Sequence, residues 1–435
     1  MSYTPVDLVE VHAFGERVGA VGADPTSGQL VFNYTPEWRR RGIELAPLTM
    51  PTSAPGPFSF PRLSEETFRG LPPLLADSLP DAFGNRLIDA WMADQGLART
   101  QITALDRLAY LADRGVGALE FRPPADLDTT PPTAIQLADL VVAARSSVAG
   151  EFDTDDALAA DALRTLISVG TSAGGARAKA VLAYNPDTGQ IRSGQLDAPD
   201  GFTHWLIKLD GVSDDSREFG TSAGFGRIEY AYHLMALDAG LHMSECRLLE
   251  EHDRAHFMTR RFDRPAGGGK RHLLSLCGIA HLDFNMKAAH SYSQYLEVVQ
   301  QLELGPDALE EAFRRIVFNV VAVNRDDHTK NLAFVMDPDG TWHLSPAFDV
   351  MFAYNPTGVW TATHQMTLAG KLEHITRVDL EQLADRFAVP GARHVIDQTV
   401  DAVSRWAEHA EAAGVTADWV EHIGGLHRQL GLKAG

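Results

Sequence analysis

The sequence predicts an α+β fold with a small β-rich part at the N-terminus and a mostly helical part at the C-terminus. Residues 5–35 alternate apolar and polar side chains in short runs separated by Gly-containing turns, which is typical of antiparallel strands. From Leu273 to the end the apolar spacing is helical, apart from one hairpin pattern near residue 337. A chain of 435 residues exceeds one ordinary hydrophobic core, so two or three domains are expected.

The composition is that of a soluble globular protein, with 45% hydrophobic and 22% charged residues. The formal net charge of −20 argues against direct binding to DNA and fits a basic protein partner. No apolar run approaches the roughly 20 residues of a membrane-spanning helix, and the N-terminus lacks the pattern of a signal peptide. Two cysteines, Cys246 and Cys277, suit a reducing compartment. A cytoplasmic protein with no membrane contact is therefore expected.

The first third of the chain is predicted as three strands followed by helices. The strands are expected at residues 6–14, 17–23 and 29–35. Residues 71–97 are predicted to be helical, with Asp81 as a helix cap and Gly96 as a stop. A helix over 103–111 and a strand over 115–123 follow, and the Pro-rich residues 123–133 suggest a boundary. The predicted domains are residues 1–130, 131–262 and 263–435.

The middle of the chain contains a Gly-rich turn between two predicted strands, after a helical stretch at residues 134–166. The turn lies within VGTSAGGARAK, residues 169–179. A tight turn is the ordinary reading of such a cluster, but kinases lay the backbone amides of a similar loop over ATP phosphates. A near copy, GTSAGFGR at residues 220–227, precedes a helical pattern and is interpreted as a loop and helix cap.

Two charged residues near this turn are candidates for a phosphate site. Lys208 lies in the predicted strand THWLIKL, and its facing cannot be read from the pattern. Glu229 lies in the predicted helix that follows. Kinases pair a strand lysine with a helix glutamate, although a single strand lysine is more often a solvated residue. The strand HFMTRRFDR, residues 256–264, then leads into a linker of the kind that joins two kinase lobes.

The chain is organised around residues 317–350, where an apolar run leads into the polar sequence NRDDHTKN. Asp326 and Asn331 fit the spacing D-x-x-x-x-N, and Asp349 follows a predicted hairpin with strands at 331–336 and 342–344. In kinases the aspartate of this motif accepts the hydroxyl proton, and the asparagine and a later aspartate hold Mg²⁺. Each piece alone fits an ordinary polar turn, but all the pieces occur in the order of a kinase, which predicts a two-lobed protein-kinase-like fold.

The sequence also resembles the HipA-like serine/threonine kinases of bacterial HipBA-type toxin–antitoxin pairs. The resemblance extends over most of the chain and is carried by VGTSAGGARAK, FMTRRFDR, NRDDHTKN and LSPAFDV. It implies a β-rich N-terminal subdomain, a kinase N-lobe-like region and a helical C-lobe. The pair Arg260-Arg261 departs from relatives, which often carry an acidic residue before Arg-Phe, so a side-chain role at residue 260 is in doubt.

The resemblance implies a role for each candidate residue. Asp326 is the implied catalytic base, and Asn331 and Asp349 are the implied Mg²⁺ ligands. Ser172 is the implied autophosphorylated serine, and Glu229 the implied partner of Lys208. The residues implied to contact ATP are Ser172, Ala173, Gly174, Gly175, Ala176, Lys208, Arg260, Arg261, Phe262, His328, Lys330, Asn331 and Asp349.

The expected function is that of a Mg²⁺- and ATP-dependent protein serine/threonine kinase acting as a toxin on a translation-related protein. A small basic HipB-like antitoxin is the implied partner, and DNA contact is expected only through it. Three alternatives remain: a small-molecule kinase of the same fold, a catalytically silent corepressor subunit, and a metal phosphohydrolase built on Asp326, Asp327 and His328. No second His/Asp pair at ligand spacing supports the phosphohydrolase.

Overall fold

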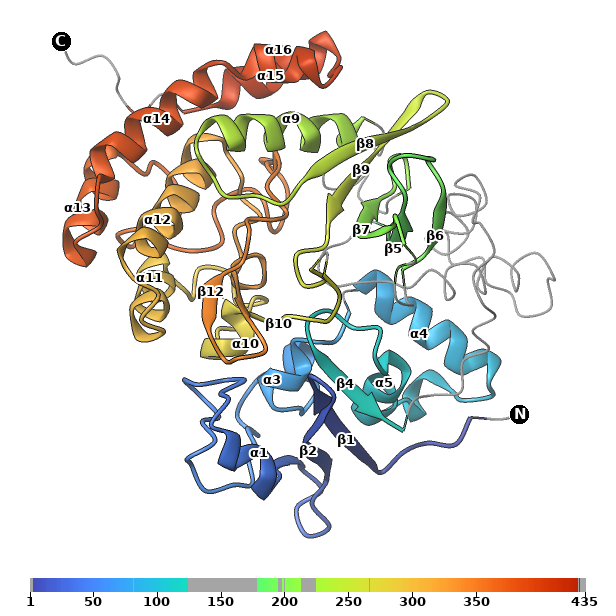
Figure 1. The fold of residues 1–435 in the computed structure, drawn as a ribbon. Helices are drawn as coiled ribbons and strands as arrows, with labels where there is room; N and C mark the ends of the chain where they lie inside the picture. The colour runs from blue at the N-terminus through green and yellow to red at the C-terminus, as the bar shows by residue number, and fades with distance from the viewer. Residues whose placement is uncertain are drawn as a thin grey trace. The chain divides into compact units, whose positions relative to one another are not determined.

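The structure is a computed structural model that describes residues 3–80, 82–123, 178–194, 198, 200–212, 224–265, 267–428 and 430. It divides into two compact units (Figure 1). Unit 1 comprises Met1–Asp214, Arg260–His281 and Val335–Thr341, and unit 2 comprises Asp215–Thr259, Leu282–Phe334 and Trp342–Gly435. The division into three domains expected from the sequence remains a prediction.

Unit 1 begins with an antiparallel sheet in the strand order β3-β2-β1-β4. Its strands are β1 (Leu8–Ala13), β2 (Glu16–Ala23), β3 (Leu30–Tyr34) and β4 (Leu119–Arg122). Alternate side chains of β1, namely Val9, Val11 and Ala13, are fully buried, because successive residues of a strand point to opposite faces. All four strands were predicted from the sequence.

The helices of unit 1 are mostly short. They are α1 (Pro36–Arg41), α2 (Glu65–Phe68), α3 (Pro73–Ala76), α4 (Ala82–Asp94), the 3₁₀ helix η1 (Arg99–Gln101) and α5 (Ala104–Leu111). The helical stretch predicted over 71–97 is divided into α3 and α4, with Pro80 between them. Proline disfavours helical backbone at the residue before it. Gly96 follows α4 with a φ of 89°, consistent with the predicted stop. The predicted cap Asp81 lies outside the described residues.

A second set of strands in unit 1 contains the candidate lysine. Strand β5 (Lys179–Tyr184) pairs antiparallel with β6 (Ile191–Ser193) and with β7 (Thr203–Lys208). In the β5–β7 register Lys179 lies directly opposite Lys208. Their side chains share one face of the sheet, since directly opposite residues of an antiparallel pair point the same way. Both are buried, at 2% and 7% exposure, which answers the question of facing at Lys208.

The linker after residue 260 is fixed within unit 1 by a buried carboxylate. Asp263 accepts hydrogen bonds from Arg261 Nε at 2.9 Å, from Arg264 at 2.7 Å and from the Gly117 N–H at 2.8 Å. Burial alone would raise the pKa of Asp263, but the Arg261 and Arg264 guanidinium groups and these hydrogen bonds hold it well below its usual range. This cluster joins the linker to the loop before β4.

The segment after this linker corrects one expectation from the sequence. Residues 272–275 form strand β10 (His272–Ser275), whereas the sequence predicted only helix from Leu273 onward. A short helix, α10 (Leu276–Ala280), follows, and its N-terminus is capped by Ser275. The Asp77 carboxylate in turn accepts from the Ser275 N–H at 2.6 Å. The periodicity of so short a run does not separate strand from helix.

Unit 2 begins with a helix packed closely on a hairpin. The hairpin consists of β8 (Cys246–Glu251) and β9 (Arg254–Arg260). Helix α9 (Phe225–Asp238) starts after Gly224, whose φ is 89°, as the interpretation of residues 220–227 as a helix cap requires. A Cβ at Gly226 would lie 1.8 Å from the Ala255 carbonyl oxygen, so only glycine allows this approach.

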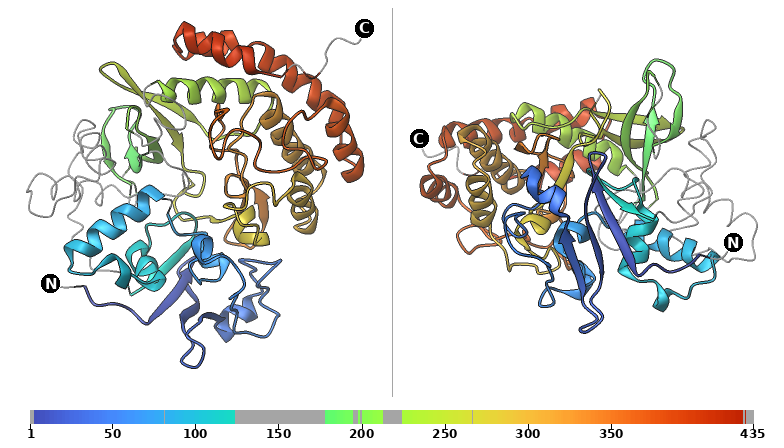
Figure 2. Two further views of the ribbon diagram at one scale, coloured as in Figure 1. Left: turned by 180° about the vertical axis from the view of Figure 1, so that it is seen from behind. Right: turned by 60° about the horizontal axis from the view of Figure 1, so that its bottom comes forward.

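The rest of unit 2 is mainly helical, as predicted. Its helices are α11 (Tyr292–Gln301), α12 (Pro306–Val321), α13 (Arg377–Phe387), α14 (Ala392–Ser404), α15 (Trp406–Ala412) and α16 (Ala417–Leu426). Figure 1 shows α9 running beneath α15, and both views of Figure 2 show the orange α11 and α12 beside the red C-terminal helices. Within the described ranges, no helix is long and apolar enough to cross a bilayer.

A hairpin follows the polar sequence NRDDHTKN. Strands β11 (Ala333–Met336) and β12 (Trp342–Leu344) flank a turn in which Gly340 has a φ of 94°. The first strand starts later than predicted, because residues 329–331 form the 3₁₀ helix η2 (Thr329–Asn331). The His328 ring caps this helix by accepting from the Lys330 N–H at 3.2 Å. Asn331 therefore ends a helical turn and is not part of the strand.

The close approach of α9 to β9 predicts a steric effect at Gly226. Gly226→Ala is expected to lower the free energy of unfolding by about 1–3 kcal/mol, because the helix must move off the strand. Gly425→Ala is the matched control, since no atom lies within 4 Å of its Cβ position in α16. Chemical denaturation of both variants checks this, and equal effects would contradict it.

The Asp263 cluster predicts a pH-dependent contribution to stability. Asp263→Asn is expected to cost about 3–5 kcal/mol at pH 7, because two buried guanidinium groups lose their counter-charge. The folded pKa lies below the ordinary value of about 3.9, so the carboxylate stabilises the fold above that pH and less as pH falls. The unfolding free energies of wild type and variant should therefore converge in acid. The exposed Asp187→Asn serves as control, and a gap that stays constant down to pH 3 would refute the assignment.

Candidate active site in the loop after helix α12

The candidate loop begins where α12 ends. Val323 takes a φ of 55°, which turns the chain out of the helix, and the Asn324 N–H donates to the Asn319 carbonyl at 3.0 Å. The Asn324 side chain also donates to Asn319 Oδ1 at 2.9 Å. Thr329 then donates through its hydroxyl to the Leu282 carbonyl at 2.6 Å. The loop is thus tied to unit 2 at both ends.

Asp327 is the buried anchor of the loop. Its side chain has no exposed surface, and it accepts from the Tyr292 hydroxyl at 2.6 Å and from the Gln365 N–H at 2.7 Å. His364 Nδ1 lies 3.0 Å from the second carboxylate oxygen. A buried carboxylate has lost the stabilisation that water provides, so it requires such partners in place of water. Asp327, the second aspartate of the pair Asp326-Asp327, is therefore surrounded in the way that a structural residue is.

The protonation of this anchor follows from its partners. Burial by itself would raise the pKa of Asp327, but the His364 ring and the three hydrogen bonds together hold it below the ordinary value. The pKa of Tyr292 is raised well above its usual value by burial and by the nearby Asp327 charge. Tyr292 therefore stays protonated and donates its hydrogen bond to a carboxylate anion.

Asp326 has the opposite environment. Its side chain is 37% exposed, and its Oδ1 atom lies 3.5 Å from His328 Nε2. Asn331 Nδ2 donates to the backbone carbonyl of Asp326 at 2.7 Å, so the two ends of the D-x-x-x-x-N motif are in contact. This hydrogen bond uses the nitrogen of the Asn331 amide and not its oxygen. The fold brings these residues together as the spacing predicted.

His328 and Lys330 lie beside one aromatic ring. The Phe284 ring is 5.6 Å from the His328 ring and 5.5 Å from Lys330 Nζ. This placement puts one cation and one imidazole at the rim of the loop, where an anionic ligand would be attracted. The sequence did not single out Phe284.

Asp349, the second of the two predicted Mg²⁺ ligands, lies in unit 2 in a half-buried position. Its φ of 52° is in the left-handed region, which Asp and Asn tolerate better than most residues. A non-glycine residue keeps this conformation only when the surrounding structure holds it there, and such residues cluster at functional sites.

The remaining predicted residues are found in different parts of the structure. Lys208 is buried in unit 1, and Glu229 is buried at 1% exposure in unit 2. Their pairing remains a prediction. Ser172, Ala173, Gly174, Gly175 and Ala176 lie outside the described residues.

The linker residues Arg260, Arg261 and Phe262 occupy the end of β9 and the turn after it. The Arg261 N–H donates to the His204 carbonyl at 2.9 Å, and its guanidinium is held by Asp263. A nucleotide contact by the Arg261 N–H or guanidinium would compete with these bonds.

Sequence reasoning missed three residues that support this loop and, separately, one residue of unit 1 that shares a sheet face with Lys208. Lys179 could have been found from the strand register, because it faces Lys208 across the sheet. Tyr292, His364 and Gln365 contact the loop from positions 35 to 38 residues away, and no local pattern marks them.

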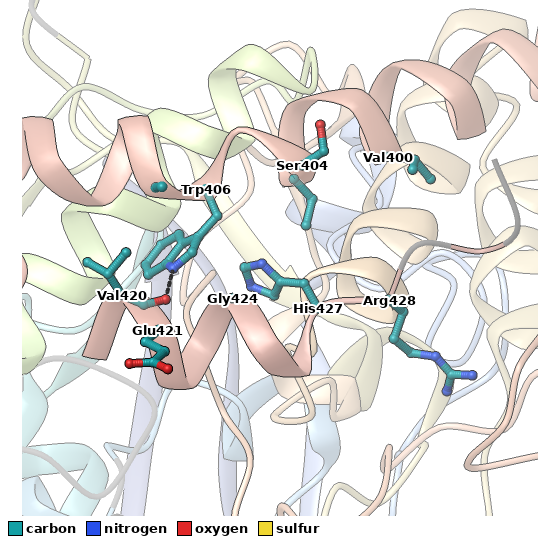
Figure 3. Close-up of a pocket in the computed structure, with 10 residues that line it drawn as sticks. Val400, Ser404, Trp406, Val420, Glu421, Gly424, His427 and Arg428 are labelled. Carbon is teal, nitrogen blue, oxygen red and sulfur yellow. Dashed lines mark hydrogen bonds between the residues drawn. The ribbon is translucent and has the colours of Figure 1, made fainter. Parts of the chain in front are cut away.

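A pocket of about 350 Å³ lies elsewhere in unit 2, among α14, α15 and α16 (Figure 3). Figure 3 shows the hydrogen bond that Trp406 Nε1 donates to the Val420 carbonyl, and its length is 3.0 Å. His427 and Arg428 also line the pocket. None of the predicted site residues lines it. Within the described ranges, no group of three or more His, Cys, Asp and Glu side chains is arranged to hold a metal ion.

Comparisons with known proteins agree with this picture. The model of the HipA N-terminal domain matches residues 9–122, and that of the HipA-like C-terminal domain matches residues 171–407. No curated protein matches the chain in sequence.

Among solved structures, HipA from the HipA, HipB and operator DNA complex of Shewanella oneidensis MR-1 is similar. Its TM-score is 0.64 at 16% identity, over 96% of this chain and 95% of that one. The Helicobacter pylori proinflammatory kinase CtkA gives a TM-score of 0.35 at 11% identity, over 60% of this chain and 94% of that one, which is too low to establish a shared fold.

The predicted fold class, α+β and two-lobed in the manner of HipA, is confirmed by the match to the Shewanella protein. The C-terminal model alone accounts for more than half of the sequence. The chain therefore belongs to the HipA-like family.

Proposed function

We propose that this protein is a Mg²⁺- and ATP-dependent protein serine/threonine kinase that acts as the toxin of a toxin–antitoxin pair. The observation that carries the proposal is the contrast within the candidate loop. Asp327 is buried and fully hydrogen-bonded, whereas the adjacent Asp326 is 37% exposed and in contact with Asn331. This division of roles suits a loop that holds one reactive carboxylate at the surface.

Asp326 is the proposed general base. Its carboxylate would accept the proton of a serine or threonine hydroxyl as the oxygen attacks the terminal phosphate of ATP. The O–H bond of the acceptor breaks as Asp326 takes the proton, and the new O–P bond forms. The bond between the γ-phosphorus and the oxygen that bridges it to the β-phosphate breaks, and its electron pair leaves on ADP. Positioning and charge stabilisation carry most of such a reaction, so the rigid anchoring through Asp327 supports it.

Asn331 and Asp349 are the proposed Mg²⁺ ligands. Their donor atoms fit this ion, because Mg²⁺ prefers hard oxygen ligands and shares them with substrate phosphates. The Asn331 nitrogen donates to the Asp326 carbonyl, so the amide oxygen is the atom proposed to bind the ion. The ion would neutralise phosphate charge when bound.

Unit 1 contributes the proposed phosphate-binding groups. Lys208 and Lys179 share one face of the β5–β7 pair, and lysine is a residue type that commonly binds phosphate. Lys179 directly follows the Gly-rich stretch that contains Ser172 to Ala176. We include these five residues, the linker residues 260–262, His328 and Lys330 in the proposed ATP site, and Glu229 as the proposed partner of Lys208.

The proposed partner is a small basic antitoxin of the HipB type. The similar Shewanella protein was solved with HipB and operator DNA, which supports this assignment. The net charge of −20 fits a basic protein and opposes direct contact with phosphates of DNA, whose binding depends on Lys and Arg. The proposed substrate is a translation-related protein, as the family resemblance implies.

The proposed base, Asp326, and the proposed Mg²⁺ ligand, Asp349, lead to different predictions. Asp326→Asn is expected to lower phosphate transfer from labelled Mg·ATP to proteins of a cell extract at least a hundredfold, with ATP binding retained. Asp349→Asn should keep its left-handed backbone but lose the stabilisation by Mg·ATP, which is about 2.7 kcal/mol at a hundredfold excess over the dissociation constant.

Transfer assays and thermal unfolding with and without Mg·ATP measure both effects. Glu408→Gln, on the exposed side of α15, is a control for loss of a carboxylate. Full transfer by Asp326→Asn would exclude this residue as base, and transfer absent in the wild type would favour the corepressor alternative.

Ser172 is the proposed site of autophosphorylation. A phosphate there would add roughly −1.5 to −2 charge to a loop proposed to bind ATP phosphates, so the modified protein is expected to bind ATP more weakly. Mass spectrometry of protein made in cells should find phosphate on Ser172 in wild type and not in Asp326→Asn. A phosphorylated form that binds ATP as well as the unmodified form would contradict the switch.

A further inference from the structure

A second segment of unit 2 is wrapped onto the candidate loop through Arg325. The Arg325 N–H donates to the Ala353 carbonyl at 3.1 Å, and its guanidinium lies 4.3 Å from the centre of the Tyr354 ring. The same guanidinium donates to the Ala362 carbonyl. The segment 353–362 therefore contacts Arg325, the residue before Asp326, at both of its ends.

Gln365 continues this segment and contacts both aspartates. Its backbone N–H donates to Asp327 Oδ1 at 2.7 Å, and its side-chain Nε2 donates to Asp326 Oδ1 at 3.0 Å. The assignment of the amide is chemical, since a carboxylate accepts hydrogen bonds and the amide nitrogen is the donor. Gln365 is buried at 4% exposure, so its amide is fixed in place.

The two oxygens of Asp326 are thereby distinguished. Oδ1 accepts from Gln365 and also lies 3.5 Å from His328 Nε2. In the described part of the chain no hydrogen bond reaches Oδ2, on a side chain that is 37% exposed. One oxygen is held by the protein, and the other is the one that an acceptor hydroxyl could approach.

We propose that Gln365 is a positioning residue that holds the Asp326 carboxylate with Oδ2 toward the acceptor. Through it, the segment 353–367 sets the orientation of the base. The inference rests on the proposed kinase function and deepens it, because it assigns control of the base to a segment outside the motif.

The geometry separates this role from simple packing. The bond from the Gln365 N–H to Asp327 is made by backbone and persists in every variant except proline. Only the side-chain amide links Gln365 to Asp326. A side-chain substitution therefore removes the contact with the base and retains the anchor.

Two variants of the full-length chain test the proposal. Gln365→Met keeps the length of the side chain without a donor, and Gln365→Glu keeps its shape but places a carboxylate against Asp326. The maximal rate of phosphate transfer from labelled Mg·ATP to a fixed amount of cell extract should fall about tenfold in Gln365→Met. It should fall further in Gln365→Glu, because two carboxylates at this distance repel each other.

The half-saturating ATP concentration should stay within about twofold of wild type in both variants, because the amide contacts the base. Gln398→Met is the matched control, since Gln398 accepts from Arg314 at 2.6 Å on α14, away from the loop. Its rate should equal that of wild type. Thermal unfolding measures the folded fraction of each variant.

The outcomes separate the two hypotheses. A wild type that transfers no phosphate overturns the proposed kinase and this inference together. An active wild type with Gln365→Met at the same rate overturns only the positioning role. A lower rate that is fully matched by a lower folded fraction, or by the same fall in Gln398→Met, also overturns it.

Discussion

The burial of the Asp327 carboxylate is the constraint on which the candidate site depends. A charged group with no exposed surface is stable only when donors surround it, and here the donors come from two separate segments. Tyr292 belongs to α11, the aspartate itself follows α12, and residues 364 and 365 lie beyond the hairpin. The carboxylate thus joins parts of unit 2 that are distant in sequence.

The arrangement explains why two adjacent aspartates differ in kind. Asp327 is fixed inward by its three partners, whereas 37% of the Asp326 side chain is exposed. The Asn331 side chain adds a second tie, to the backbone carbonyl of Asp326. The main chain at residue 326 is consequently held from both sides, while its side chain remains accessible. Rigid supports of this type are what a positioned reactive group requires.

Much of the fold could be predicted because it follows local rules. The strands of the N-terminal sheet show period-two alternation, and the hairpin turn near Gly340 requires a positive φ that glycine supplies. The D-x-x-x-x-N contact was also predictable, because five residues span a single tight loop. Strand β10 was not, since a run of only four residues, HLLS, fits a strand or a helix equally well.

The supporting residues could not be predicted for a different reason. Gln365 and His364 reach the loop across 37 to 39 positions, and such a contact leaves no periodic trace in one sequence. Lys179 was harder to predict than the local motifs and easier than the distant contacts. Its place opposite Lys208 follows from the register of β5 and β7, and that register depends on the β5–β6 hairpin and on the longer connection to β7. Sequence reasoning identified the candidate reactive residues, and it missed the residues that hold them in place.

The wide separation of the Asp327 partners also bears on synthesis of the chain. Domains fold as the polypeptide emerges, N-terminal parts first, at about 5–20 residues per second. Until residue 365 of the 435 has left the ribosome, the Asp327 carboxylate lacks two of its partners and cannot be buried at low cost. The candidate loop is therefore among the last parts of the protein to take its final form. A nascent chain, or one cut short before this point, contains the D-x-x-x-x-N motif without the structure that supports it.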